Sequence, residues 1–252
     1  MSVTSTYPLP KLVGHRGAAA LAPENTLVGF RAAAAAGVTG VEFDVRLSAD
    51  GVPVVIHDAT LERTTSGKGP VAAQTAATLG ALDAGAWFAP RFKGERLPTL
   101  EATIGVLREL GLAANIELKS EGDGARALAR AVAAVVARAW PADRAPPILS
   151  SFDAGCVAAC REFAPDVPRA FLVEAPDRKA LATARTLDCV AIHANQRRLN
   201  QKLTTMVKND GWRCAAYTVD DPARARRLLA WGVDCVITNA PDRLKAALGD
   251  AL

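Results

Sequence analysis

Three carboxylates and a lysine alternate with apolar residues in two short β-rich segments of the chain. Glu42 and Asp44 belong to the first segment, and Glu117 and Lys119 belong to the second. Because successive side chains of a strand point to opposite faces, these polar side chains should share one face. Buried carboxylates need a partner, and the hard cations Mg²⁺ and Ca²⁺ prefer oxygen ligands. We therefore predict that the three carboxylates bind one divalent cation. The alternative is that Glu42 or Glu117 forms an ion pair with Lys119 or Arg16.

The chain contains only three histidines, and each is predicted where a strand or its returning arm ends. Histidines at such positions can serve as general acid and general base, and we apply this interpretation to His15 and His57. For His193 a structural role or a substrate contact is favoured. Arg16 and Lys119 add groups that bind phosphate, so the set indicates metal-assisted cleavage of a phosphoester. A glycosidase needs a carboxylate pair but none of these cationic and imidazole groups.

The elements that must position these residues follow a regular alternation. Strands are predicted near 11–15, 40–44, 114–118, 147–151, 169–173, 189–193, 213–217 and 235–238, and helices near 25–36, 99–110, 123–138, 153–163, 178–186, 199–209, 221–231 and 241–248. Four helices are followed by a glycine, which tolerates the left-handed conformation of a helix end: Gly37, Gly111, Gly211 and Gly232. Eight strands and eight helices in alternation predict an α/β fold, the (β/α)₈ TIM barrel. A doubly wound open sheet is the alternative.

Two segments after the second strand depart from this alternation. Asp50-Gly51 between two β-rich runs predicts a hairpin, whose returning arm at 54–56 brings His57 towards the carboxyl ends of the strands. Residues 58–98 are too long for a loop within a barrel, so we predict a small inserted subdomain there. Residues 1–252 then form a single barrel domain with one insertion.

The composition is that of an ordinary soluble globular protein. Of the 252 residues, 50% are hydrophobic and 22% are charged, and the net charge of +4 comes from dispersed basic residues, so no nucleic-acid partner is expected. The five cysteines form no CxxC pair and do not indicate a disulfide framework. Residues 1–10 do not resemble a secretion signal, and no run of 18 apolar residues occurs. We expect a cytoplasmic protein without stable membrane association.

A series of short motifs spans nearly the whole chain. They are His15-Arg16-Gly17, Pro23-Glu24-Asn25-Thr26, Glu42-Phe43-Asp44-Val45, His57-Asp58, Leu61-Glu62-Arg63-Thr64, Leu97-Pro98, Asn115-Ile116-Glu117-Leu118-Lys119, Ser150-Ser151-Phe152, Tyr217-Thr218-Val219 and Trp231-Gly232-Val233-Asp234. In this order they resemble the glycerophosphodiester phosphodiesterases. The resemblance is greatest to the cytoplasmic bacterial members associated with glycerol-phosphate uptake.

The resemblance implies a role for most of the polar residues named above. It implies metal ligation by Glu42, Asp44 and Glu117, acid/base catalysis by His15 and His57, and phosphate contacts from Arg16, Lys119 and Asn25. Asn25 is also compatible with capping the helix that follows it. Phe152 and Tyr217 are expected to wall the glycerol side of the pocket, with Trp87 contributed by the insertion. Packing in the core is the alternative for these three aromatic residues.

The implied reaction converts a glycerophosphodiester, such as glycerophosphocholine or glycerophosphoethanolamine, into sn-glycerol 3-phosphate and an alcohol. One divalent cation, Mg²⁺ or Ca²⁺, is the implied cofactor, and water or the glycerol 2-hydroxyl can be the nucleophile. A lysophospholipase D acting on lipids, or a non-catalytic binder of glycerophosphodiesters, is the alternative. Two residues depart from the family's usual pattern, Asp220 in place of asparagine and Asn239 in place of aspartate. We expect neither to touch the metal-binding or histidine residues.

Overall fold

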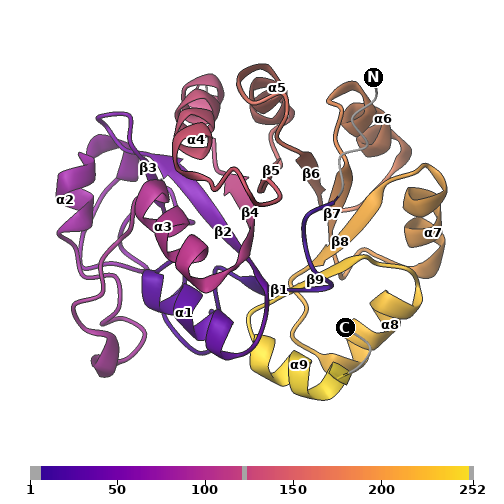
Figure 1. Ribbon diagram of the computed structural model, residues 1–252, viewed down its shortest axis with the longest axis horizontal. Helices are drawn as coiled ribbons and strands as arrows, with labels where there is room; N and C mark the ends of the chain where they lie inside the picture. The colour runs from indigo at the N-terminus through magenta and orange to yellow at the C-terminus, as the bar shows by residue number, and fades with distance from the viewer. Residues whose placement is uncertain (1–6, 121–123, 250–252) are drawn as a thin grey trace.

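A closed parallel barrel forms the centre of the molecule (Figure 1). The computed structural model describes residues 7–120 and 124–249. The barrel strands are β1 (Leu12–His15), β2 (Gly40–Leu47), β4 (Ala113–Leu118), β5 (Ile148–Ser151), β6 (Arg169–Val173), β7 (Ala191–Asn195), β8 (Arg213–Tyr217) and β9 (Cys235–Thr238). Strand β1 pairs in parallel with both β2 and β9, which closes the sheet. The predicted TIM barrel is therefore confirmed, and the open sheet is excluded.

Helices follow the strands and surround the barrel (Figure 1). They are α1 (Leu27–Ala35), α3 (Leu100–Leu110), α4 (Ala125–Ala139), α5 (Ala154–Phe163), α6 (Arg178–Thr186), α7 (Gln201–Asn209), α8 (Pro222–Ala230) and α9 (Pro241–Leu248). The predicted start of the third barrel helix, at 123, lies outside the described residues. All four glycines predicted at helix ends have positive φ angles, between 70° and 97°. None of the helices in the described part of the chain is long and apolar enough to cross a membrane.

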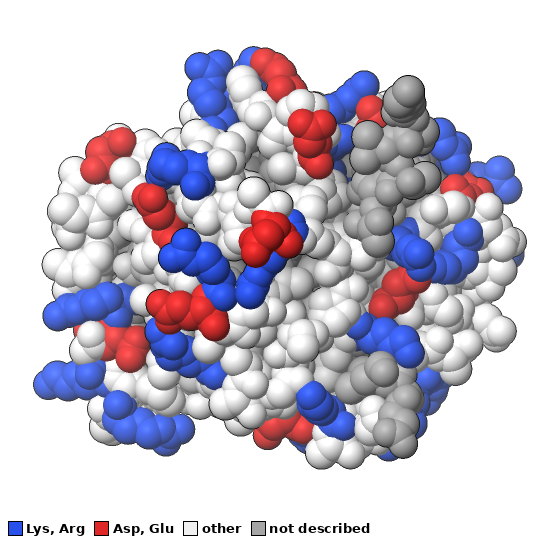
Figure 2. Space-filling view, viewed as in Figure 1, with Lys and Arg blue, Asp and Glu red and all other residues white. Residues whose placement is uncertain are grey.

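Apolar residues fill both sides of the barrel wall. The larger core lies between helices and strands, and a smaller one fills the barrel interior, with members such as Val13, Ile148, Ala191 and Cys235. Apolar side chains fill most of this interior, and His193 is a polar side chain buried among them. On the outside, Lys and Arg side chains lie among Asp and Glu side chains over the face drawn in Figure 2.

The predicted hairpin and insertion follow β2. Strand β3 (Pro53–Val55) runs antiparallel to the end of β2, with Val45 opposite Val55. The segment after β3 contains η1 (Val71–Ala73), α2 (Ala76–Gly80) and η2 (Pro90–Phe92). It has a small apolar core of its own, formed by Val54, Ile56, Leu61, Val71, Leu79, Ala84 and Leu97. The assignment of 58–98 as a subdomain distinct from the barrel stays a prediction.

One strand lies two residues later than expected. The sequence predicts a strand near 189–193, whereas β7 covers Ala191–Asn195. Helix α6 ends in a turn in which Asp188 adopts a positive φ of 49° and the Cys189 N–H donates to Ala184 O, so the chain is not yet extended there. His193 therefore lies in the middle of β7, and the prediction that it ends a strand is wrong.

Candidate active site

A cavity of about 390 Å³ opens at the carboxyl ends of the barrel strands. Most of its lining comes from residues at or just after a strand end, as expected for a TIM barrel. The lining residues are His15, Arg16, Glu42, His57, Asn115, Glu117, Lys119, Phe152, Leu172, Asn195, Gln196, Arg197, Tyr217, Thr218 and Ile237. Both predicted acid/base histidines and both predicted phosphate-binding cations are among them.

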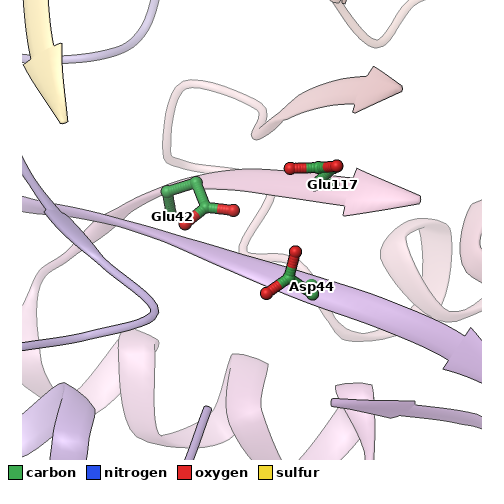
Figure 3. A group of neighbouring side chains, drawn as sticks. All are labelled: Glu42, Asp44 and Glu117. Carbon is green, nitrogen blue, oxygen red and sulfur yellow. The ribbon is translucent and has the colours of Figure 1, made fainter. Parts of the chain in front are cut away.

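Three buried carboxylates lie close together (Figure 3), and two of them, Glu42 and Glu117, line this cavity. Glu42 and Asp44 project from β2 and Glu117 projects from β4, where the register pairs Asp44 with Glu117. One oxygen of each carboxylate lies within 4.8 Å of the others. The three residues are only 1–6% exposed. The alternation in the two strands thus brings the predicted ligand set together.

Mutual repulsion and burial change the acidities of these groups. Burial, together with Asp44 and Glu117, raises the pKa of Glu42 well above its usual value. Burial and then Asp44 raise the pKa of Glu117 to about 7. Burial acts in the same direction on Asp44, but Arg16 and Lys119 outweigh it and lower the pKa of Asp44 to about 2.

Two positively charged side chains, Arg16 and Lys119, partly neutralise the negative charge of the three carboxylates. Arg16 Nε lies 3.1 Å from Asp44 Oδ2, and Lys119 Nζ lies 3.2 Å from Asp44 Oδ1 and also contacts Glu117. The ion pairing considered as an alternative is therefore present, but it leaves an excess of negative charge. Oε1 of Glu42 is buried without a hydrogen-bond partner among the described residues. A compact oxygen-ligand set with surplus negative charge fits a hard divalent cation.

Asn25 holds Asp44 at two points. Its Nδ2 donates to Asp44 Oδ2 over 2.9 Å, and its Oδ1 accepts from the Asp44 N–H over 3.2 Å. The cap of α1 is Thr26, whose side chain accepts from the Gly29 N–H, so the helix-capping alternative for Asn25 is wrong. Asn25 instead adopts a left-handed φ of 58°, which asparagine tolerates better than most residues.

The two histidines of the cavity have different partners. His15 Nδ1 lies 2.7 Å from Asn239 Oδ1, and its Nε2 lies 3.7 Å from Glu42 Oε2. Burial and the charge of Arg16 lower the pKa of His15 to about 4. His57 Nδ1 lies 2.6 Å from Asp58 Oδ1. The pKa of His57 is also lowered, by burial in the first place, against the attraction of nearby carboxylates.

Asn239 thus contradicts the expectation that the two departures from the family pattern stay clear of the histidines. Its amide touches His15 directly, and Asp220 Oδ2 accepts from Asn239 Nδ2 over 2.8 Å. The reason is the closure of the barrel, which places the end of β9 beside the end of β1.

Arg63, from the insertion, has no role assigned from the sequence beyond its place in a family motif. Its guanidinium donates to Asp58 over 2.6 Å and to Glu24 over 2.8 Å. Asp58 in turn contacts His57, and Glu24 accepts from Arg16 over 2.7 Å. Hydrogen bonding by Arg63 accordingly lowers the pKa of Asp58 despite its partial burial. Arg63 is therefore linked to two cavity residues, to His57 through Asp58 and to Arg16 through Glu24.

The predicted aromatic wall is only partly assembled. Phe152 and Tyr217 line the cavity edge to face, with ring centres 5.9 Å apart. Trp87 does not line it: its indole N–H donates to Ala84 O and its ring packs on Phe88 within the insertion. His193 is fully buried in the barrel interior, with Nε2 3.3 Å from the hydroxyl of Tyr7, and does not line the cavity either.

Several lining residues were not predicted from the sequence. Asn115 lies two residues before Glu117 in β4 and therefore on the same face, so the alternation that predicts Glu117 at the site also predicts Asn115 there. Asn195, Gln196 and Arg197 lie at and beyond the end of β7, and the misplaced strand boundary concealed them.

A family model and several known proteins match this chain. The model of the glycerophosphoryl diester phosphodiesterase family matches residues 15–243. A glycerophosphodiester phosphodiesterase of Bacillus subtilis is 32% identical over 247 residues, covering 91% of this chain and 83% of that protein. One from Caldanaerobacter subterraneus is 30% identical over 233 residues, covering 92% and 95%.

Among solved structures, an Oleispira antarctica phosphodiesterase in complex with the product sn-glycerol-3-phosphate is similar, with a TM-score of 0.92 and 33% identity. The match covers 95% of this chain and 97% of that one. The matches in sequence and in structure thus extend over the barrel and the cavity residues together. The chain therefore belongs to the glycerophosphoryl diester phosphodiesterase family and is an enzyme that hydrolyses glycerophosphodiesters.

Proposed function

We propose that the chain hydrolyses glycerophosphodiesters to sn-glycerol 3-phosphate and an alcohol, with one divalent cation and with two histidines as general acid and base. The observation that carries this proposal is a cluster of three buried carboxylates, two of which line one cavity together with two histidines. The Oleispira antarctica relative, whose structure holds sn-glycerol-3-phosphate, supports the proposed product.

Glu42, Asp44 and Glu117 would hold the cation, Mg²⁺ or Ca²⁺. When bound, such an ion polarises phosphoryl oxygens and offsets the negative charge that develops during cleavage. Arg16 and Lys119 flank the same space and would bind the phosphate oxygens, the first as a planar fork and the second as a point charge. Asn25 would keep the carboxylate of Asp44 in one orientation through its two hydrogen bonds.

His15 and His57 would move the protons of the reaction. Their lowered pKa values favour the neutral form near pH 7, which is the form that a general base needs; the histidine that acts as general acid must first take up the proton that it transfers. One would deprotonate the nucleophile, and the other would protonate the departing alkoxide. Each ring is fixed through Nδ1, by Asn239 or by Asp58, which leaves Nε2 for the substrate.

The glycerol and alcohol portions would occupy the remainder of the cavity. Phe152 is 42% exposed and forms an apolar wall with Tyr217, and Asn195 and Arg197 add polar groups near the opening. Small soluble diesters such as glycerophosphocholine and glycerophosphoethanolamine suit a cavity of about 390 Å³. All five cysteines are free and buried, which suits the reducing cytoplasm that we propose as the location.

The test is an assay of glycerol 3-phosphate release from these two diesters, before and after treatment with EDTA. We expect activity to disappear with EDTA and to return with Mg²⁺ or Ca²⁺. Unchanged turnover in EDTA would exclude the metal-dependent reaction. Lysophosphatidylcholine serves as the comparison substrate, and faster turnover of this lipid than of glycerophosphocholine would contradict the proposed substrate class.

A further inference from the structure

His15 and Asn239 are neighbours because β1 and β9 pair where the barrel closes. Gly14 lies opposite Thr238 in this parallel register, so His15 and Asn239 are the next residues of the two strand ends. His15 Nδ1 and Asn239 Oδ1 are 2.7 Å apart. On its other side, Asn239 Nδ2 donates to Asp220 Oδ2 over 2.8 Å. The three side chains form a continuous hydrogen-bonded row that ends at the cavity.

The carboxylate of Asp220 is held in place by further donors. Its Oδ1 accepts from the hydroxyl of Thr238 over 2.9 Å and from the Asn239 N–H over 2.8 Å. Partial burial acts to raise the pKa of Asp220, but the hydrogen bonds from Asn239 and Thr238 outweigh it and lower the pKa below its usual value. Asp220 is therefore ionised at neutral pH and offers only acceptors.

The direction of every hydrogen bond in the row follows from that carboxylate. An ionised carboxylate cannot donate, so the amide NH₂ of Asn239 must face Asp220 and the amide oxygen must face His15. An amide oxygen cannot donate either. The hydrogen between Asn239 and His15 therefore has to be carried by His15 Nδ1.

We propose that Asp220 and Asn239 are positioning residues that act through His15: Asp220 orients the amide of Asn239, and this amide holds His15 in the tautomer with hydrogen on Nδ1. In this tautomer the lone pair of a neutral His15 is on Nε2, the ring nitrogen 3.7 Å from Glu42 Oε2. His15 thus presents an acceptor to the cavity. The inference rests on the proposed acid/base role of His15.

The two residues that depart from the family pattern are consequently one pair with complementary chemistry. If the amide and the carboxylate were exchanged, an asparagine at 220 could accept from the Thr238 hydroxyl with its oxygen and donate with its NH₂. A carboxylate at 239 could accept from that NH₂ and from His15 Nδ1. The exchanged pair therefore preserves the tautomer of His15. Asp220→Asn alone removes the charge that orients the Asn239 amide, and Asn239→Asp alone places two carboxylates side by side.

The tautomer can be measured by NMR of the protein labelled with ¹⁵N-histidine. The chain has only three histidines, and a His15→Gln spectrum identifies the signals of His15. We expect the Nδ1–H form of His15 to dominate in the parent and to lose this dominance in Asp220→Asn. Asp234→Asn is the matched control: Asp234 accepts hydrogen bonds from Lys208, Arg213 and the Cys214 N–H just before β9, and its loss should leave the His15 signals unchanged.

The rate of glycerol 3-phosphate release supplies the second measurement. Asp220→Asn and Asn239→Asp should each lower kcat by about 10- to 100-fold, as is typical when the partner that orients a functional histidine is lost. The second variant would bring two carboxylates together. The double variant should recover to within about threefold of the parent, because the two sites couple directly.

Two results would overturn the inference. One is a double variant no more active than the product of the two single effects, and the other is an unchanged His15 tautomer in Asp220→Asn. If the parent itself releases no glycerol 3-phosphate, the proposed function fails instead. The NMR comparison still tests the inference in that case.

Discussion

Glu117→Gln should make the metal-free protein more stable while it removes the response to a divalent cation. The free carboxylate of Glu117 is buried beside Asp44, and its pKa is raised from 4.5 to about 7. Each tenfold change in acidity corresponds to about 1.4 kcal/mol, so at pH 8 the ionised group costs the folded protein about 3 kcal/mol. The attraction of Lys119 is already contained in this shift. Glutamine has the same shape without the charge and avoids this cost.

The pH dependence of this effect has a definite sign. Because the folded chain holds the Glu117 proton more tightly than the unfolded chain, the stabilisation is complete below pH 4.5 and is lost as the pH rises through about 7. The advantage of the variant over the parent should therefore be large at pH 8 and absent near pH 4.5. For a chain of this size about 3 kcal/mol corresponds to a Tm difference of about 6–12 °C.

Thermal unfolding followed by circular dichroism, in EDTA and then with Mg²⁺ or Ca²⁺, measures both effects. In the parent, a cation at about 100 times its Kd should add about 2.7 kcal/mol of stability, and in Glu117→Gln this gain should largely disappear. Glu101→Gln is the matched control, since Glu101 pairs with Arg138 on the exposed surface and should change neither Tm nor the cation response. A variant that is less stable than the parent in EDTA at pH 8, or that keeps the full cation shift, would refute this reasoning.

Three further predictions concern His57, Arg63 and Gly14. His57→Gln should lower kcat by about 10²- to 10⁴-fold at unchanged Tm, and near-normal steady-state rates would contradict its role. Arg63→Met should lower kcat/KM by about 10- to 100-fold, because Asp58 and Glu24 lose their hydrogen bonds to Arg63. An unchanged value would show that these hydrogen bonds are not needed for activity. Gly14→Ala should destabilise the fold by about 1–3 kcal/mol or more, since the new Cβ would lie 2.0 Å from Gly17 O. Gly105→Ala, in an open helical position, should instead raise Tm slightly, and equal effects of the two substitutions in thermal melts would contradict this explanation.

The acidic site was predictable because its pattern is local. Period-two alternation decides which side chains of a strand share a face, and the barrel places the ends of parallel strands at one opening. The pairing of Asp44 with Glu117 in neighbouring strands then follows without long-range information. The contact of Asn25 with Asp44, by contrast, depends on a left-handed turn that the sequence pattern does not reveal.

The position of a residue along a strand is harder to predict than the face of the strand on which its side chain lies. A boundary error of two residues keeps every side chain on its face but moves it about 6–7 Å along the strand axis. This is why His193 was expected at the cavity and lies in the buried interior beside Tyr7, while Asn195, two residues later, lines the cavity. Trp87 shows the same limit in the insertion, where no strand pattern indicates which surface an aromatic ring will cover.

The contact between His15 and Asn239 follows from a property of the whole fold. The two residues are 224 positions apart, yet any closed barrel makes its first and last strands neighbours, so their carboxyl ends must meet. In the sequence, Asp220 and Asn239 are two separate departures from the family pattern. Closure makes them a single hydrogen-bonded pair beside a histidine, in which the charge of one side chain sets the orientation of the next. An exchange of amide and carboxylate between two strand ends can therefore leave the histidine's environment intact, although each position taken alone differs from the family pattern.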